Sequence, residues 1–208
     1  MANEPRILAV GTANPPFRYS QRVIYDVSKR FVPAYASPRI EQIFMSSDID
    51  YRYLAIDFRS FSPDETPDDL HHRFEEYSVK LAVEAARGAL TKSSVSEVDI
   101  DYVAAVSCTG YLCPGLSALL IKELGLRKDV QRSDLIGMGC AGAMPGLQRG
   151  YEYVKTYPDR NALVVAVEIC SACYYVDDSL ETVVGNAICA DGASAVVIGN
   201  HGAGGDRC

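Results

Sequence analysis

A chain of 208 residues, 48% of them hydrophobic and 23% charged, can bury a sizeable core, which excludes an intrinsically disordered protein. The 20 Lys and Arg residues against 27 Asp and Glu give a net charge of −7 without any basic run, so neither nucleic acid nor a membrane is an expected partner. Seven cysteines without a regular spacing, no signal peptide and no apolar run near ~18 residues predict reduced thiols in a cytoplasmic protein.

Strand and helix patterns alternate through the first part of the chain. The expected elements are a strand over 6–11, a loop, a Ser20-capped helix over about 21–33, a helical stretch over 37–47 and an extended stretch over 51–56. A long helix begins after Thr66, with Pro67 at its first position and acids in its first turn, and continues to about residue 91. Its apolar residues recur at helical spacing and predict one buried stripe: Leu70, Phe74, Tyr77, Leu81, Ala85 and Gly88.

The alternation continues to the end of the chain. Strands are expected over 101–107, 133–138, 161–170 and 193–198, and helices over 114–125, 140–157 and 179–190. Strands that alternate with helices in this way predict an α/β fold in which parallel strands are joined by crossover helices. No linker or internal repeat occurs, so we expect one domain over residues 1–208.

Cys140 is the most informative residue, because an apolar stretch turns there through small residues into a helix. Gly139, Ala141 and Gly142 let backbone and substrate approach closely. A cysteine at a helix N-terminus feels the positive end of the macrodipole, which stabilises the thiolate, the nucleophilic form. The alternative is a small buried thiol in a strand-to-helix turn.

Cys170 and Cys173 have the spacing of a metal-binding or redox pair. Only one such pair occurs, and no second pair of suitable ligands follows it. We therefore expect no metal site.

Several motifs in the order of one known family indicate a resemblance. The chain resembles the N-terminal half of a type III polyketide synthase, the chalcone synthase-like branch of the thiolase superfamily. The resemblance implies a thiolase-like fold, here the N-terminal half of an αβαβα layered architecture with a mostly parallel mixed sheet, without the C-terminal thiolase-like half. The motifs are Arg-Tyr at 52–53, Cys-Pro-Gly at 113–115, Gly-Cys-Ala-Gly-Ala at 139–143, Val-Glu-Ile-Cys at 167–170 and Gly-Asn-Ala-Ile-Cys-Ala-Asp-Gly at 185–192.

The resemblance implies a homodimeric acyltransferase without a permanently bound cofactor. Cys140 would accept an acyl group from an acyl-CoA thioester and condense it with malonyl-CoA, which loses carbon dioxide. In the family, a histidine and an asparagine stabilise the resulting enolate, and both belong to the C-terminal half. No residue of this chain matches either of them. We therefore expect the chain alone to be inactive, and a separate C-terminal half is a possible partner.

Further site residues follow from the resemblance. Cys113 matches a loop residue that reaches the neighbouring subunit's cavity in the dimer. Cys189 stands where many members carry a phenylalanine that assists malonyl decarboxylation, although a core thiol is an equally good interpretation. Arg39 and Arg52 are the remaining candidates for CoA phosphate contacts, with salt bridges as their alternative role. The residues implied to line the substrate cavity are Cys108, Thr109, Cys170, Cys173 and Cys189.

Two alternatives stay open. A ketoacyl synthase of the fatty-acid-initiating type shares the fold and the nucleophile, but its usual Ala-Cys-Ser/Ala-Gly-Phe text differs from residues 138–143. A non-catalytic half-length protein could bind an acyl-CoA or a separate C-terminal half without condensing anything. Because the two halves of the family's fold pack against each other, an isolated half is expected to expose an apolar face and to associate with itself or with a partner.

Overall fold

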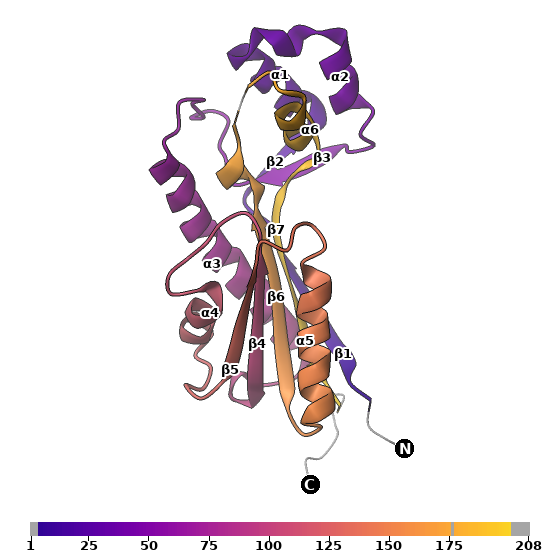
Figure 1. The fold of residues 1–208 in the computed structure, drawn as a ribbon, viewed down its shortest axis with the longest axis vertical. Helices are drawn as coiled ribbons and strands as arrows, with labels where there is room; N and C mark the ends of the chain where they lie inside the picture. Colours follow the sequence, from indigo (N-terminus) through magenta and orange to yellow (C-terminus); the bar gives the residue numbers. More distant parts are fainter. Residues whose placement is uncertain (1–3, 176, 201–208) are drawn as a thin grey trace. The chain divides into compact units, whose positions relative to one another are not determined.

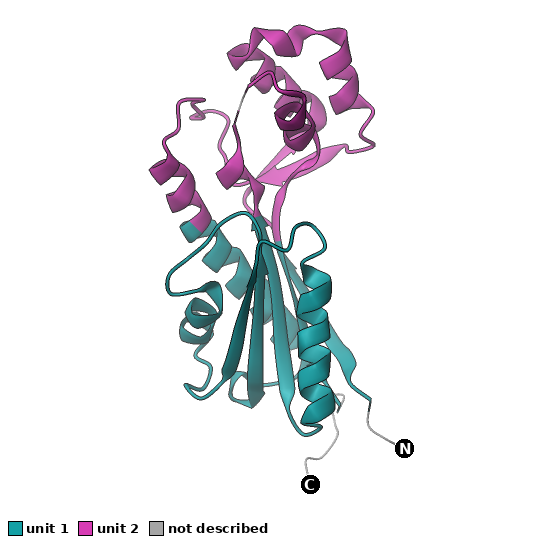
Figure 2. Ribbon diagram, in the orientation of Figure 1, with its two compact units in different colours: residues 1–13, 75–168, 193–208 teal, residues 14–74, 169–192 magenta. Residues whose placement is uncertain are grey.

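The computed structural model describes residues 4–175 and 177–200. The chain forms two compact units, shown in Figure 2. Unit 1 comprises residues 1–13, 75–168 and 193–208, and unit 2 comprises residues 14–74 and 169–192. The expectation of one domain rests on sequence continuity alone and stays a prediction. No helix in the described part of the chain has both the length and the apolar character needed to cross a membrane.

Unit 1 contains a five-stranded mixed sheet with the strand order β1-β7-β6-β4-β5 (Figure 1). β4 runs parallel to both of its neighbours, β5 and β6, whereas β1 is antiparallel to β7. The predicted α/β fold with a mixed, mostly parallel sheet is therefore confirmed. The strands are β1 (Arg6–Ala13), β4 (Ile100–Ser107), β5 (Gln131–Ile136), β6 (Asn161–Ile169) and β7 (Asp191–Gly199).

The helices of unit 1 cover both faces of this sheet. Val196 and Ile198 of β7 face α5. Ala195 points to the opposite face, and its partner Gly11 on β1 lies against the backbone of α3. The helices are α3 (Pro67–Ser93), of which unit 1 holds the part from Glu75, α4 (Leu116–Leu124) and α5 (Ala143–Thr156), with a 3₁₀ turn, η2 (Glu97–Asp99).

Close approach of α5 to the sheet depends on two glycines. A Cβ atom on Gly146 would lie 2.7 Å from Val106, and one on Gly150 would lie 2.7 Å from Val164. Real Cβ contacts are longer, so only glycine lets the helix lie this close to the strands. This packing fixes the N-terminal end of α5 over the end of β4.

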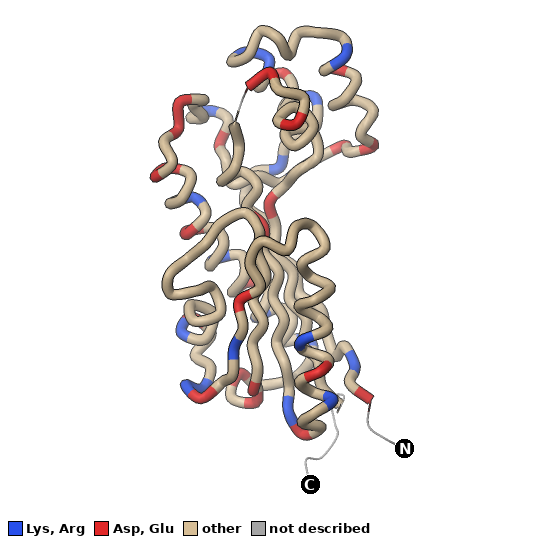
Figure 3. The backbone as a smooth tube through the Cα atoms, viewed as in Figure 1, with Lys and Arg blue, Asp and Glu red and all other residues tan. Residues whose placement is uncertain are grey.

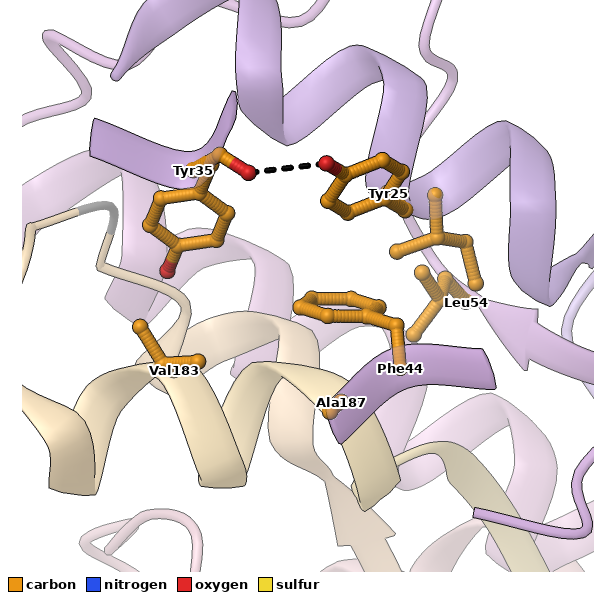
Figure 4. Packing of buried hydrophobic residues seen from close by; sticks show 7 residues of the cluster. Tyr25, Tyr35, Phe44, Leu54, Val183 and Ala187 are labelled. Atoms are coloured by element: carbon orange, nitrogen blue, oxygen red, sulfur yellow. Dashed lines mark hydrogen bonds between the residues drawn. The ribbon is translucent and has the colours of Figure 1, made fainter. Parts of the chain in front are cut away.

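Unit 2 is built around an aromatic core. Figure 4 shows Tyr25, Tyr35 and Phe44 packed together, with the Tyr25 hydroxyl donating to the Tyr35 carbonyl at 2.8 Å. Val183 and Ala187 of α6, which lie far from these residues in sequence, pack against the same cluster. The elements are β2 (Phe17–Ser20) paired antiparallel with β3 (Tyr51–Leu54), α1 (Gln21–Phe31), η1 (Pro33–Ala36), α2 (Pro38–Met45), η3 (Cys170–Cys173) and α6 (Leu180–Ile188).

One element was not expected from the sequence, and one expected boundary was wrong. Residues 17–20, which lie between the expected loop and the expected helix, form β2, because they pair with β3 across 31 or more residues of sequence. The helix expected from Cys140 begins at Ala143, because residues 140–142 form a turn in which the Gly142 N–H donates to the Gly139 carbonyl at 2.9 Å. The other predicted elements agree with the structure to within a few residues at their ends.

Candidate active site

Cys140 lies at the carboxyl edge of the parallel strands, in the turn between β5 and α5. Gly137 and Gly139 take φ values of +74° and +71°, a left-handed conformation that glycine adopts without strain. The Gly137 N–H donates to the Ser107 carbonyl at 3.1 Å and so ties the turn to the end of β4. Cys140 itself is exposed, so the alternative of a buried structural thiol does not hold within this structure.

Gly142 seats the turn on the sheet. It is buried, and a Cβ atom there would meet a Val106 methyl group at 3.0 Å and the Gly139 carbonyl oxygen at 3.1 Å. The turn therefore packs on the sheet through Gly142, whereas Cys140 is exposed to solvent. Open α/β sheets bind their ligands at this carboxyl edge.

Glu168 organises the adjacent loop. It stands near the end of β6, and its carboxylate accepts hydrogen bonds from the Cys108 N–H at 2.9 Å, the Thr109 N–H at 3.0 Å and the Thr109 hydroxyl at 2.8 Å. Because β4 and β6 are parallel neighbours, both ends reach the same edge as Cys140. Cys108 is exposed there. Sequence reasoning quoted Glu168 in a motif without assigning it a role; its only local signal is a carboxylate inside an apolar strand.

Glu168→Gln is expected to loosen this loop. The Cys108 N–H reaches both carboxylate oxygens, at 2.9 and 3.0 Å, and an amide keeps only one acceptor oxygen and no negative charge. The charge-assisted hydrogen bonds that hold the loop therefore weaken, at a cost of about 1–2 kcal/mol. We expect hydrogen exchange at the Cys108 and Thr109 amides to accelerate about tenfold. Glu152→Gln, on the exposed side of α5, is the control and should leave both amides unchanged. Unaltered protection in the Glu168 variant would contradict this role.

The Cys113 loop is fixed at the same edge by Asp134. The Asp134 carboxylate accepts the Ser117 N–H at 2.9 Å and the Ser117 hydroxyl at 2.5 Å, and therefore caps the N-terminus of α4. A Cβ atom on Gly115 would lie 2.6 Å from the same carboxylate, so a larger residue in the Cys-Pro-Gly motif would displace the carboxylate that caps α4. Cys113 is exposed two residues earlier.

Apart from Glu168 and Asp134, the unit 1 loops at this edge carry no charged side chains, whereas charged residues lie at the opposite end of the sheet. Figure 3 shows the loops before α4 and α5 without Lys, Arg, Asp or Glu, and charged residues at the amino ends of the strands. There the buried Asp101 carboxylate pairs with Arg127 and Arg160 at 2.8 and 2.6 Å. Four large apolar side chains of the carboxyl edge are 40–67% exposed: Tyr111, Ile136, Met138 and Met144.

The remaining predicted cavity cysteines lie in unit 2. Cys170 and Cys173 begin and end η3, and Cys189 follows the last residue of α6. The thiol of Cys170 hydrogen bonds to the Cys189 sulfur, and this bond, helped by Arg52 and opposed by burial and Asp191, lowers the pKa of Cys189 to about 6. Among residues 4–175 and 177–200, no group of three His, Cys, Asp or Glu side chains could hold a metal ion.

Asp191 holds the segments that carry these cysteines together. Its carboxylate accepts the Ser171 N–H at 2.8 Å, the Ser171 hydroxyl at 2.6 Å and the Ala55 N–H at 2.5 Å. Burial raises the pKa of Asp191, and these hydrogen bonds partly offset that effect. One side chain therefore joins the residue after Cys170 to the end of β3.

The two predicted CoA contacts differ in placement. Arg39 is exposed on α2. Arg52 is only 3% exposed; its Nε donates to Gln21 at 2.9 Å and its Nη1 donates to the Cys189 carbonyl at 2.6 Å. The guanidinium is thus held by an amide oxygen and a backbone carbonyl oxygen within unit 2, and a CoA contact of Arg52 stays a prediction.

The predicted site residues divide between the two units. Glu168 holds Cys108 and Thr109 in unit 1, and Asp191 holds the segments of Cys170 and Cys189 in unit 2. Unit 1 contains Cys108, Thr109, Cys113 and Cys140, and unit 2 contains Cys170, Cys173, Cys189, Arg39 and Arg52.

A layered α/β domain with a cysteine in a strand-to-helix turn at the carboxyl edge of its sheet is the arrangement of thiolase-like enzymes. Residues 59–207 match the family described as FAE1/Type III polyketide synthase-like protein. The chain belongs to this family.

Two of the relatives of this chain are synthases. A 3,5-dihydroxyphenylacetyl-CoA synthase of Streptomyces toyocaensis is 34% identical over 197 residues, which are 93% of this chain and 49% of the relative. A 1,3,6,8-tetrahydroxynaphthalene synthase of Streptomyces peucetius subsp. caesius is 32% identical over 205 residues, 95% of this chain and 54% of the relative. The chain therefore spans about half the length of these relatives.

Solved structures of the family share the fold. PKS-I from the brown alga Ectocarpus siliculosus has a TM-score of 0.86 and 33% identity, and the match covers 94% of this chain and 56% of that one. The type III polyketide synthase domain of Steely1 from Dictyostelium gives a TM-score of 0.86 at 29% identity, with the same coverage. The predicted thiolase-like α/β fold is confirmed, and it corresponds to about half of those chains.

Proposed function

We propose that this chain carries the acyl-loading half of a type III polyketide synthase. Cys140 takes an acyl group from an acyl-CoA thioester, and malonyl-CoA then extends the acyl chain. The single observation that supports this most directly is the exposed Cys140 thiol in a glycine turn at the carboxyl edge of the sheet, in a chain of this family. No permanently bound cofactor takes part in this chemistry.

Loading is a transthioesterification. The Cys140 thiolate attacks the carbonyl carbon of the starter thioester, a new carbon–sulfur bond forms, and the CoA thiolate leaves and takes up a proton. The exposed apolar side chains beside Cys140 provide a surface for the acyl chain. Cys108 and Thr109, held by Glu168, lie at the same edge as the site for the substrate.

Extension needs groups that stabilise the enolate from malonyl-CoA. In the family these are a histidine and an asparagine of the C-terminal half, and no residue of this chain matches them. We therefore propose that condensation requires a C-terminal thiolase-like half, and that the assembled enzyme is a homodimer. The exposed apolar edge around Met138 and Met144 supports such an association.

Intact-mass spectrometry after incubation with a panel of acyl-CoA starters tests the loading step. We expect an adduct of the acyl mass, mapped to the Cys140 peptide, that is absent in Cys140→Ala. Cys113→Ala removes another exposed thiol at the same edge and should leave the adduct in place.

The two possible results separate loading from condensation. An adduct on the chain alone, without polyketide product, would support loading with condensation assigned to the other half. If no adduct forms on Cys140 either alone or with an added C-terminal half, the proposed function is wrong.

A further inference from the structure

Cys170 and Cys189 form a thiol pair that acyl transfer at Cys140 does not use. They lie 19 residues apart in sequence, but the Cys170 thiol donates a hydrogen bond to the Cys189 sulfur. Ser171, the residue after Cys170, donates its N–H and its hydroxyl to Asp191, two residues after Cys189, at 2.8 and 2.6 Å. These two hydrogen bonds hold the Cys170 segment against the Cys189 segment.

A buried cation supports negative charge on this pair. Arg52 is 3% exposed, its Nη1 donates to the Cys189 carbonyl at 2.6 Å, and its Nη2 has no hydrogen-bond partner among the described residues. Arginine stays protonated even where burial lowers its pKa, as it does here. The other charged group beside Cys189 is Asp191, which opposes the thiolate, and Tyr174 lies near Arg52. The Cys170 hydrogen bond outweighs the opposition, since the pKa of Cys189 is lowered to about 6.

Both sulfurs are open to a small oxidant. Cys189 is exposed and Cys170 is half-buried. Reactive cysteines of this kind combine an accessible thiolate with a neighbouring thiol that can complete a disulfide.

We propose that Cys170 and Cys189 are a peroxide-sensitive dithiol that closes to an intramolecular disulfide. The Cys189 thiolate attacks one oxygen of hydrogen peroxide, the O–O bond breaks, and hydroxide leaves, so that Cys189 becomes a sulfenic acid. Cys170 then attacks the Cys189 sulfur, the S–O bond breaks, and the departing hydroxide takes the thiol proton to form water. The two sulfurs lose two electrons in total, and the peroxide gains them. The inference does not depend on the acyl-loading proposal.

Peptide mapping of the full chain after oxidation tests the disulfide. The reduced protein is treated with hydrogen peroxide, remaining thiols are blocked with N-ethylmaleimide, and the digest is analysed without reductant. We expect a cross-linked species joining the Cys170 and Cys189 peptides, lighter by two hydrogens, that disappears with dithiothreitol. Recovery of both cysteines as blocked thiols, or a link from Cys170 to Cys173 instead, would overturn the proposal.

Three variants assign the roles of the two sulfurs. Cys170→Ser should stop the reaction at a Cys189 sulfenic acid, which dimedone traps. Cys189→Ser should abolish both the cross-link and the dimedone adduct. Cys173→Ser, the matched control from the other end of η3, should leave the cross-link in place. A dimedone adduct on Cys170 in the Cys189→Ser protein would reverse the assigned order and overturn it.

Alkylation of the unmodified protein gives a test that needs no variant. Iodoacetamide labelling of Cys189 should follow a midpoint near pH 6 in the folded chain, against about 8.5 in urea. At pH 7 the folded chain then holds about 30-fold more Cys189 thiolate, and the lower nucleophilicity of a less basic thiolate reduces this to an alkylation rate about threefold faster. A folded midpoint equal to that in urea would contradict the proposed thiolate.

Discussion

Gly11→Ala is expected to lower the free energy of unfolding by about 3 kcal/mol or more. Gly11 lies on β1 where α3 crosses the sheet, and a Cβ atom there would stand 2.0 Å from the Ala85 carbonyl oxygen and 2.5 Å from the Ala89 nitrogen. Both atoms belong to the backbone of a long helix, so no side chain can rotate away to make room. Urea denaturation followed by circular dichroism measures the loss.

Gly88→Ala is the matched control for this contact. Gly88 belongs to α3, and its added Cβ atom would lie 3.7 Å from the Gly11 Cα, an ordinary van der Waals distance. Alanine is favoured over glycine inside a helix by up to about 1 kcal/mol, so this variant should be as stable as the parent or more stable. Equal destabilisation by the two substitutions would show that the close approach of β1 to α3 is not the cause.

Asp191→Ala is expected to cost about 2–4 kcal/mol. Asp191 is 5% exposed, and its removal leaves the Ala55 and Ser171 N–H groups without the acceptor that now satisfies them. Ser171→Ala removes only the hydroxyl and leaves the carboxylate with both N–H donors, so its cost should be about 1 kcal/mol. Thermal unfolding of the three proteins measures the series. Equal losses in both variants would contradict the assignment of Asp191 as the central acceptor.

Local chemistry explains why the helices could be predicted from the sequence. The Ser20 side chain accepts the Val23 N–H, as its position before an apolar run indicated. Thr66 accepts the Asp69 N–H and Asp69 accepts the Thr66 N–H, a reciprocal cap formed within four residues. Both partners of each capping interaction lie within four residues of one another, so a local sequence motif is enough to predict it.

The organisation of the site depends on partners that the sequence places far apart. Glu168 binds the Cys108 N–H across 60 residues, and Asp191 binds the Ala55 N–H across 136. No periodicity indicates such a pair. Cys140 itself could be predicted because its motif is local, but the start of α5 could not, because it is set by the turn at Gly139 and by packing on Val106. Burial of Arg52 likewise depends on Gln21 and Cys189, which the motif around Arg52 does not contain.

The antiparallel pairing of β1 with β7 determines the order in which the sheet can form. Arg6 pairs with Gly199 and Ala13 with Ala193. Among the described strands, β1 lies at one edge of the sheet and pairs only with β7, which comes last in sequence order. Closing so long a loop is entropically costly, and contacts this distant in sequence slow folding. During synthesis β1 must therefore stay unpaired, with its apolar residues exposed, until β7 has left the ribosome.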